Sequence, residues 1–166
     1  MVFESTERFA GVSKVIAMRQ RSDEVNVRPA AAGDAERIAA LSEQLGYAAT
    51  AEEMQRRLNS IEEDKTHAVY VAEVSGENVV GWVHIYSSYL LVRGSQAEIG
   101  GLIVDASHRR SGIGQLLIQH AEEWARAKGC NSINIRSNIT RREAHAFYKK
   151  IGYKNVKTQR VFRKIL

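Results

Sequence analysis

Residues 98–124 read EIGGLIVDASHRRSGIGQLLIQHAEEW, in which an apolar run, a turn rich in arginine and glycine, and an amphipathic run follow one another. The apolar run is rich in β-branched residues, which favours a strand. Gly100 and Gly101 interrupt it and indicate a bulge or a place where another molecule approaches the backbone. After Gly114 the apolar residues recur at helical spacing, so one face of the predicted helix packs on the sheet; these residues are Leu116, Leu117, Ala121 and Trp124.

The turn between this strand and this helix has the composition of an anion-binding site. The first amides of a helix have no partners within the helix, and the peptide dipoles add partial positive charge there. Gly112 and Gly114 carry no side chain, so a phosphate or pyrophosphate can approach these amides, and Arg109 and Arg110 add formal charge beside them. The alternative is a turn that uses glycine only for its backbone freedom, and a G-x-G pattern alone does not decide between the two.

Two nucleotide-binding motifs are excluded at this turn. A P-loop needs Lys followed by Ser or Thr after its last glycine, whereas Gln115 and Leu116 follow Gly114. A dinucleotide-binding fingerprint needs a third glycine three residues after the second, where this chain has Leu117. What remains is the pattern R-x-x-G-x-G, which begins five residues after the end of an apolar strand.

This pattern strongly resembles the acyl-CoA-binding motif of the GNAT superfamily of N-acetyltransferases. A second match supports the resemblance, because Asn138 is followed by AHAFYKKIGY at residues 144–153. The resemblance covers nearly all of residues 26–166. It implies an α/β fold of GNAT type, in which about four helices flank a mostly antiparallel, twisted sheet of about six to seven strands. It also implies acetyl-CoA as the co-substrate, with no metal.

The resemblance assigns a set of cofactor-binding residues. The backbone amides of the turn would hold the pyrophosphate of acetyl-CoA, the end of the preceding strand would pair with the pantetheine arm, and a downstream asparagine would hydrogen-bond that arm. The residues concerned are Ile103, Val104, Arg109, Arg110, Ser111, Gly112, Ile113, Gly114 and Asn138.

Acetyl transfer to an amine requires that the amine lose a proton, that the oxyanion be stabilised and that the leaving thiolate be protonated. Glu98 resembles the strand glutamate that is the general base in the histone-acetylating branch of the superfamily; the alternative is a structural carboxylate. The same resemblance implies that Tyr148 protonates the leaving thiolate. The alternative is that Tyr148 only completes the apolar stripe of the helix predicted after residues 140–143. A backbone amide near Val104 would stabilise the oxyanion. His84 and His145 receive no role from the sequence.

The sequence of residues 26–95 predicts a short strand, two helices and a β-hairpin. A short strand at residues 26–28 precedes the single proline, and helices are expected from the N-cap Asp34 to Gly46 and after the capping box at residues 50–53. Residues 67–74 and 79–86 read as a β-hairpin. Residues 87–95 are expected to cross toward the next strand, at residues 96–105.

Three further elements are predicted after the central helix. They are a strand at residues 131–137, a helix that starts at the capping box of residues 140–143, and a last basic strand at residues 153–166.

Length and composition indicate one folded domain, because 166 residues with 44% hydrophobic content suffice for a single core. We expect residues 25–166 to form the N-acetyltransferase domain, and residues 1–24 to be an extension that is disordered or docks on a partner subunit. The sequence has no apolar run of membrane-spanning length and no signal-peptide core, and the lone Cys130 excludes an internal disulfide. We therefore expect a cytoplasmic protein.

The net charge of +5 is unevenly divided along the chain. Residues 1–105 hold 10 basic and 16 acidic side chains, whereas residues 106–166 hold 14 basic and 3 acidic ones. The basic half suits a polyanionic co-substrate such as acetyl-CoA, and the acidic half suits a cationic amine acceptor. Nucleic acid is a disfavoured partner, because the aromatic residues of the basic half fall at helix-core spacing. A membrane is not expected, and a homodimer is left open.

These interpretations predict a transferase, an acetyl-CoA-dependent N-acetyltransferase in which a primary amine attacks the thioester directly. The acceptor stays unidentified. A covalent acetyl-enzyme is disfavoured because Cys130 has no evident activating partner. The alternative is a non-catalytic acyl-CoA-binding or regulatory module on the same fold, and a third reading is a basic nucleic-acid-binding domain.

Overall fold

The computed structural model describes residues 25–75 and 78–166. The predictions for residues 1–24 and for the turn residues Gly76 and Glu77 lie outside the described residues. The chain divides into two compact units, of which the first ends at Ile135 and the second runs from Arg136 to Leu166.

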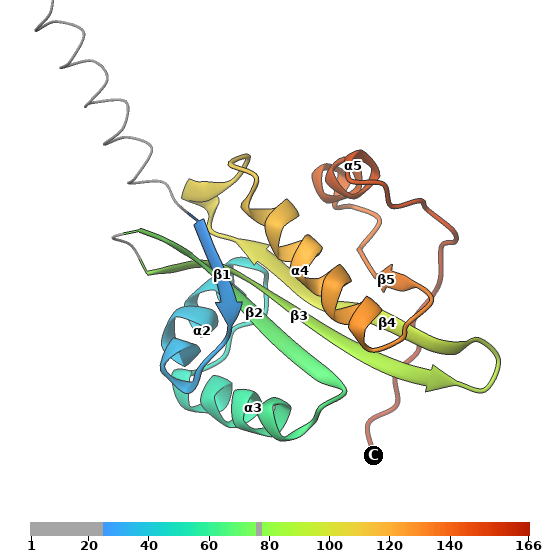
Figure 1. Cartoon of the computed structure of the whole chain (residues 1–166), viewed down its shortest axis with the longest axis horizontal. Helices are drawn as coiled ribbons and strands as arrows, with labels where there is room; N and C mark the ends of the chain where they lie inside the picture. Colours follow the sequence, from blue (N-terminus) through green and yellow to red (C-terminus); the bar gives the residue numbers. More distant parts are fainter. Residues whose placement is uncertain (1–24, 76–77) are drawn as a thin grey trace, which may run out of the picture. The chain divides into compact units, whose positions relative to one another are not determined.

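The first unit is built on one five-stranded sheet with the strand order β1-β2-β3-β4-β5 (Figure 1). The first four strands are antiparallel neighbours, and the fifth runs parallel to the fourth. Their bounds are β1 (Val25–Pro29), β2 (His67–Val74), β3 (Val79–Leu90), β4 (Gly94–Val104) and β5 (Ile133–Ile135). The predicted mixed α/β class with a mostly antiparallel sheet is confirmed, with fewer strands than the six to seven expected.

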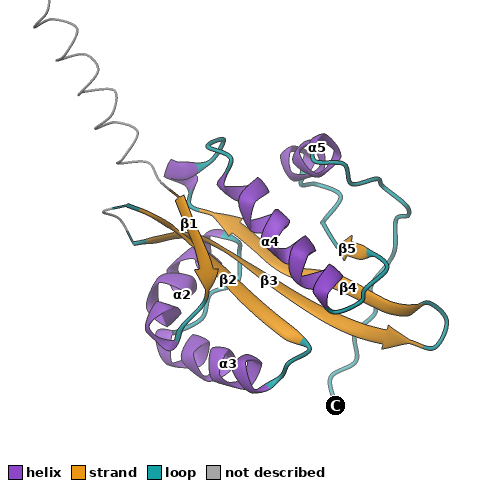
Figure 2. Cartoon of the chain, viewed as in Figure 1, coloured by secondary structure: helices purple, strands orange, loops and turns teal. Residues whose placement is uncertain are grey.

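Helices lie on both faces of this sheet (Figure 2). In the first unit they are η1 (Ala32–Asp34), α2 (Ala35–Gln44), α3 (Ala51–Glu63), η2 (Ala106–His108) and α4 (Ile113–Ala127). The predicted capping box of α3 is confirmed, since Thr50 Oγ1 accepts from the Glu53 amide at 3.2 Å and the Thr50 amide donates to Glu53 Oε2 at 3.1 Å. Among the described helices, none combines the length and apolar composition that a bilayer crossing requires.

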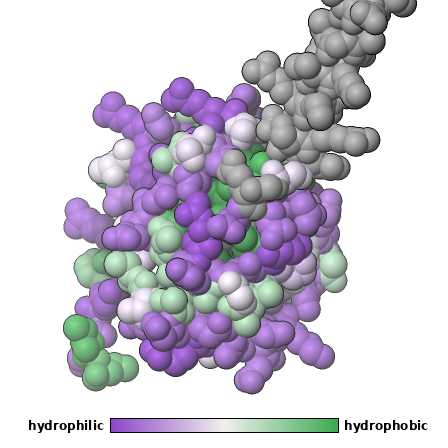
Figure 3. Space-filling model, turned by 90° about the vertical axis from the view of Figure 1, so that its left-hand side faces the viewer, coloured by the Kyte–Doolittle hydropathy of each residue, from purple (hydrophilic) through white to green (hydrophobic). Residues whose placement is uncertain are grey.

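Alternate residues of β3 divide the core into two layers, as a strand period of two demands. Trp82 packs against the cluster formed with α2 and α3, which includes Ile38 and Leu58. Its neighbour Gly81 faces the other side, where a Cβ at position 81 would lie 3.3 Å from Leu117 of α4. The central helix therefore covers one face of the sheet, and α2 with α3 covers the opposite face. The molecular surface seen in Figure 3 is mostly hydrophilic.

Two predictions in the first unit are wrong in detail. Residues 87–95 do not cross between strands: β3 continues to Leu90, and a three-residue turn leads back into β4 at Gly94, which has a φ of 71°. Asp34 does not cap α2 through its side chain. Its carboxylate accepts from the amide of Ala31 at 2.8 Å and from the guanidinium of Arg28, so it joins β1 to η1 instead.

The second unit contains one helix, α5 (Arg142–Lys150). The capping box predicted at Thr140 is wrong, because Thr140 donates from its amide and hydroxyl to Asn138 Oδ1, at 3.0 and 2.9 Å, and the helix begins two residues later. The predicted strand at residues 153–166 is also wrong. The segment has no regular secondary structure, and its unit offers no strand with which its backbone could pair. The strand predicted at residues 131–137 is shortened to β5.

Candidate active site

The turn predicted to bind an anion, residues 109–114, lies at the head of α4 in an unusual backbone conformation and is called the phosphate turn below. Gly112 is the N-cap, with a φ of 88°, and a Cβ at this position would meet no atom within 4 Å. Arg110 also has a positive φ, of 65°, a conformation that costs energy for a residue with a side chain and is found most often at functional sites. Residues 109–112 are exposed, whereas Ile113 is buried and anchors the helix.

The first amides of α4 include donors that have no acceptor within the helix. The amides of Gln115 and Leu116 donate to the carbonyl oxygen of Gly112, at 3.0 and 3.1 Å, and so begin the intrahelical bonding. The amides of Ile113 and Gly114 precede them and have no preceding helical turn to bond. Together with the two neighbouring arginines, these donors form a positively polarised turn that suits a phosphate group.

Within the described residues, the strand before this turn has one edge that is only partly paired. The ladder between β4 and β5 covers Ala97 to Ile99, whereas the ladder between β4 and β3 continues to Val104. Beyond Ile99 the outer edge of β4 is therefore no longer paired with β5. Ile103 and Val104 lie in this part of the strand, after the bulge at Gly100. Arg109 Nε donates to the Val104 carbonyl at 3.4 Å, which ties the turn to the end of the strand.

Glu98 lies on β4 directly opposite Tyr86 of β3, in the half of the strand that also pairs with β5. Residues opposite each other in an antiparallel ladder share a face, so Glu98 is on the face that α2 and α3 cover. The side chain is half-buried. Of the two predicted catalytic residues, Glu98 thus belongs to the first unit, with the phosphate turn.

Asn138 and Tyr148 both belong to the second unit. The oxygen of the Asn138 carboxamide is engaged in a local turn with Thr140, which leaves its amide group as the donor for another molecule. Tyr148 is half-buried on α5, and its ring packs beside Phe147 and Tyr153 with centroids 5.4 and 6.1 Å away. Burial raises the pKa of the Tyr148 phenol, against the opposing charge of Arg141. The phenol is therefore protonated at neutral pH and can donate a proton.

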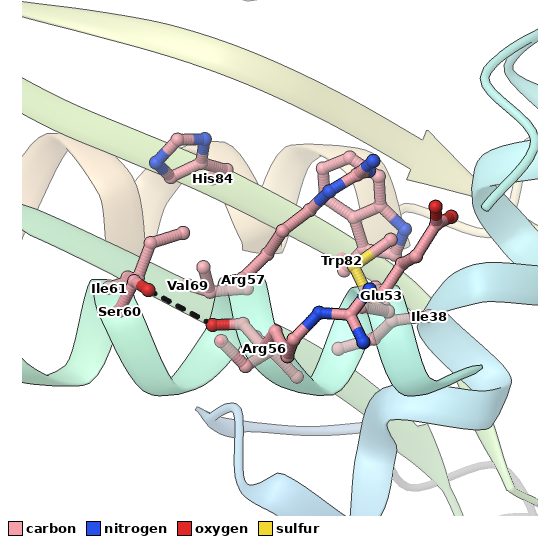
Figure 4. Close-up of a pocket in the computed structure, with 11 residues that line it drawn as sticks. Ile38, Glu53, Arg56, Arg57, Ser60, Ile61, Val69, Trp82 and His84 are labelled. Carbon is pink, nitrogen blue, oxygen red and sulfur yellow. Dashed lines mark hydrogen bonds between the residues drawn. The ribbon is translucent and has the colours of Figure 1, made fainter. Parts of the chain in front are cut away.

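A pocket of about 570 Å³ lies between α3 and the face of the sheet that carries Glu98 (Figure 4). Its apolar wall includes Ile38, Met54 and Leu58, and its polar rim includes Glu53, Arg56, Arg57 and Ser60. Trp82 and His84 of β3 line it from the sheet side, and Arg57 reaches from α3 across toward Trp82 (Figure 4). Such a pocket can receive a small polar molecule.

His84 is a residue of this pocket to which the sequence assigned no role. It is half-buried and contacts His67 of β2, with His67 Nδ1 and His84 Nε2 2.9 Å apart. The hairpin register pairs His67 with Tyr86, which brings the two imidazoles side by side. The hairpin predicted at residues 67–74 and 79–86 agrees with this register, and strand alternation places both histidines on one face.

Comparisons with known proteins support one family. The acetyltransferase (GNAT) family profile matches residues 35–153. An aminoalkylphosphonate N-acetyltransferase of Salmonella typhimurium is 38% identical over 77 residues, which are 46% of this chain and 50% of that protein. An aminoglycoside N(6')-acetyltransferase type 1 of Klebsiella aerogenes is 34% identical over 73 residues, which are 44% of this chain and 48% of that protein. The match thus spans about half the length of these relatives.

The fold has solved counterparts. The structure of AAC(6')-Iy in complex with the bisubstrate analogue CoA-S-monomethyl-acetylneamine superposes with a TM-score of 0.76 at 17% identity, covering 86% of this chain and 99% of that one. At this identity the likeness concerns the fold alone. The family profile covers well over half of the chain, in the segment that contains the phosphate turn and the pocket. The chain belongs to the acetyltransferase (GNAT) family.

Proposed function

We propose that this chain is an acetyl-CoA-dependent N-acetyltransferase that transfers the acetyl group to a primary amine by direct attack. The observation that carries the proposal is the head of α4, where Gly112 has a φ of 88° and the first helical amides stand beside Arg109 and Arg110. Membership of the acetyltransferase (GNAT) family also supports acetyl transfer. The curated relatives are named for acetyl transfer to aminoalkylphosphonates and aminoglycosides, which supports an amine as the acceptor.

The residues of the turn fit a diphosphate. A Cβ at position 112 would stand in the open space that a phosphate needs, and glycine leaves that space free. Residues 109 to 114 would bind the diphosphate of acetyl-CoA through amides and guanidinium groups. The outer edge of β4 at Ile103 and Val104, which lies beyond the ladder with β5, would bind the amide groups of the pantetheine arm. Asn138, in the second unit, is proposed as a further cofactor-binding residue. When bound, the thioester supplies an activated acetyl group.

Two side chains are proposed to move protons. An alkyl ammonium has a pKa near 10, so the acceptor needs a base at neutral pH. Glu98 is the proposed base, because its carboxylate is half-buried on the face that the pocket occupies. Tyr148 is the proposed acid, because its raised pKa keeps the phenol protonated until the thiolate leaves. The amide of a residue near Val104 is proposed to stabilise the oxyanion.

The pocket under α3 is the proposed acceptor site. Its rim carries Glu53, Arg56 and Arg57, so it offers charges of both signs to a small polar amine. We keep the acceptor itself unidentified. A cytoplasmic location and a homodimer also stay predictions.

A thiol-release assay with acetyl-CoA and a panel of amines tests the function. The panel contains aminoalkylphosphonates, aminoglycosides, amino acids and lysine peptides, each read against acetyl-CoA alone. The proposal predicts amine-dependent thiol release and a product heavier by one acetyl group. Binding of acetyl-CoA without release against any amine would favour the non-catalytic CoA-binding module instead. Binding to DNA or RNA that falls steeply with salt and that CoA does not compete would favour the nucleic-acid-binding reading.

A further inference from the structure

Three polar side chains form a row from solvent to the proposed acceptor pocket. Asp64 follows the last turn of α3, and its Oδ2 lies 3.7 Å from Nε2 of His67. The other ring nitrogen of His67 lies 2.9 Å from Nε2 of His84, and the two rings stack with centroids 5.2 Å apart. Half of the Asp64 side chain is exposed, whereas His84 lines the pocket. The row therefore connects the pocket with the surface.

The inner end of the row faces the bulge of β4. A Cβ at Gly100 would lie 2.8 Å from Nδ1 of His84, so this nitrogen points at the backbone of residue 100. Residue 100 is an exposed glycine, so no side chain at this position covers Nδ1 of His84. Glu98 lies two residues earlier on the same strand and on the same face of the sheet. It stands opposite Tyr86, whose ring centroid lies 5.9 Å from that of His84, so water molecules can connect the Glu98 carboxylate with His84.

We propose that His84, His67 and Asp64 relay to solvent the proton that Glu98 takes from the acceptor amine. The inference rests on the function proposed above and adds to it a route by which Glu98 regains its charge before the next turnover. His84 is then a proton carrier that faces the reacting groups. His67 and Asp64 are positioning residues that act through it.

The relay is balanced when each ring gains one proton and gives up another. A proton from the Glu98 carboxyl reaches His84 Nδ1 through water while the proton on His84 Nε2 passes to His67 Nδ1. The proton on His67 Nε2 then leaves to water beside Asp64. After the product leaves and water enters the pocket, each ring separately gives its Nδ1 proton to water and takes one from water on Nε2, without passage back through the pair, and this restores the starting tautomers. The route requires that neutral His84 carry its proton on Nε2 and neutral His67 on Nε2, which the geometry allows.

The electrostatics agree with this assignment. Burial, and then the neighbouring His67, lowers the pKa of His84 to about 4, so His84 is neutral at pH 7 and does not retain the proton. Hydrogen bonds from Thr66 lower the pKa of Asp64, so a carboxylate stands at the outer end of the row, 3.7 Å from Nε2 of His67. Among the described residues, the other titratable or charged groups on this side of His84 are Tyr86 and Glu98 from the sheet and Glu53, Arg56 and Arg57 from α3.

Steady-state kinetics of the full chain with the best amine of the panel test the relay. His84→Gln and His67→Gln should each lower kcat about 10-fold at pH 7 and leave the KM for acetyl-CoA unchanged, since general acid-base steps contribute at least this much. The loss should disappear near pH 10, where the amine arrives without its extra proton. Since the steps are in series, Glu98→Gln/His84→Gln should be no slower than Glu98→Gln alone. His120→Gln, on the opposite face of the sheet, is the matched control.

Nitrogen-15 spectra of the histidine rings give a second readout that needs no turnover. The relay predicts neutral His84 with its proton on Nε2 at pH 7, and a changed tautomer ratio in His67→Gln. A wild-type enzyme that turns over amines while both histidine variants keep its kcat would overturn the relay and leave the proposed function standing. His84 protonated on Nδ1 would do the same. Absence of turnover against every amine would remove the proposed function and the relay with it.

Discussion

Arg37 of α2 forms an ion pair with Asp105, the residue that follows the last residue of β4. The same carboxylate accepts from the amide and hydroxyl of Ser107, at 3.0 and 2.7 Å, and caps η2. The Asp105 amide also donates to the Val80 carbonyl at 2.7 Å. One side chain therefore connects a helix, the end of a strand and the segment that leads into the phosphate turn.

We predict that Asp105→Asn weakens acetyl-CoA binding by roughly 3- to 10-fold and lowers the free energy of unfolding at pH 7 by about 1–3 kcal/mol. The reason is that charge-assisted hydrogen bonds to a side chain that is 14% exposed are lost or weakened. Calorimetric titration measures the first effect, and urea denaturation measures the second. Glu43→Gln removes an exposed carboxylate from α2 and is the matched control. Unchanged affinity and stability in Asp105→Asn would contradict the role of this residue.

The same variant has a predicted pH dependence. Hydrogen bonds from Ser107, and then the Arg37 guanidinium, hold the pKa of Asp105 well below its usual range. A lowered pKa in the folded state stabilises the fold above the unfolded value of about 4, and the contribution is lost as the pH falls through the folded value. The stability difference between wild type and Asp105→Asn should therefore be constant from pH 5 to 8 and shrink below about pH 4. Urea denaturation at several pH values checks this.

Gly112→Glu is predicted to abolish measurable acetyl-CoA binding. Any side chain at a φ of 88° strains the backbone by about 1–2 kcal/mol, and a carboxylate there also repels the diphosphate. Gly129→Glu is the matched control, because Gly129 follows the C-cap of α4, has a φ of 70° and likewise has no atom within 4 Å of a Cβ. It introduces similar strain and the same charge at the other end of the helix. Equal losses of affinity in both variants would show that strain, and not the turn, controls binding.

Tyr148→Phe is predicted to lower kcat about 10- to 100-fold and to leave the KM for acetyl-CoA within about 3-fold, because only the proton donor is removed. Burial raises the pKa of Tyr148, so wild-type turnover should show no loss of this donor up to at least pH 9. The measurement is the pH profile of kcat in both proteins. Tyr47→Phe, which changes a tyrosine that is 71% exposed, should have no effect. An unaltered profile in Tyr148→Phe would assign the acid elsewhere.

Gly100→Ala is predicted to lower kcat about as much as His84→Gln. The new Cβ would lie 2.8 Å from His84 Nδ1, so the ring must shift and the path from Glu98 to this nitrogen closes. Gly33→Ala adds the same methyl group where a Cβ would meet no atom within 4 Å, and it should leave kcat unchanged. Stopped-flow thiol release at pH 7 measures both variants. A Gly100→Ala enzyme with wild-type kcat would mean that no proton passes between Glu98 and His84 Nδ1 during turnover.

Most of the fold follows from local patterns in the sequence. The β2–β3 hairpin, the capping box at Thr50 and the strand-turn-helix around α4 were predictable, because alternation, capping and helical spacing act within a few residues. The strand at residues 153–166 was predicted from alternation alone. A strand also needs a neighbour that pairs with it, and alternation carries no information on whether one is present.

The candidate site was predictable only in part, for the same reason. The phosphate turn is a contiguous motif, so the sequence identified Arg109 to Gly114 as one feature. His67 and His84 lie 17 residues apart and meet only through the register of a hairpin. A lone histidine receives no role from the sequence, whereas the structure brings these two histidines into contact and places His84 in the wall of a pocket. The pocket itself depends on how α3 packs over the sheet, which no local pattern specifies.

The most direct test of the account is a titration of nitrogen-15-labelled protein with acetyl-CoA, followed through the backbone amides. We predict that the largest chemical-shift changes occur at Gly112, Ile113 and Gly114, that Ile103 and Val104 follow, and that Gly112→Glu removes all of them. Acetyl-CoA that binds with its largest changes elsewhere, and leaves these amides unmoved, would contradict the central claim that the head of α4 holds the diphosphate.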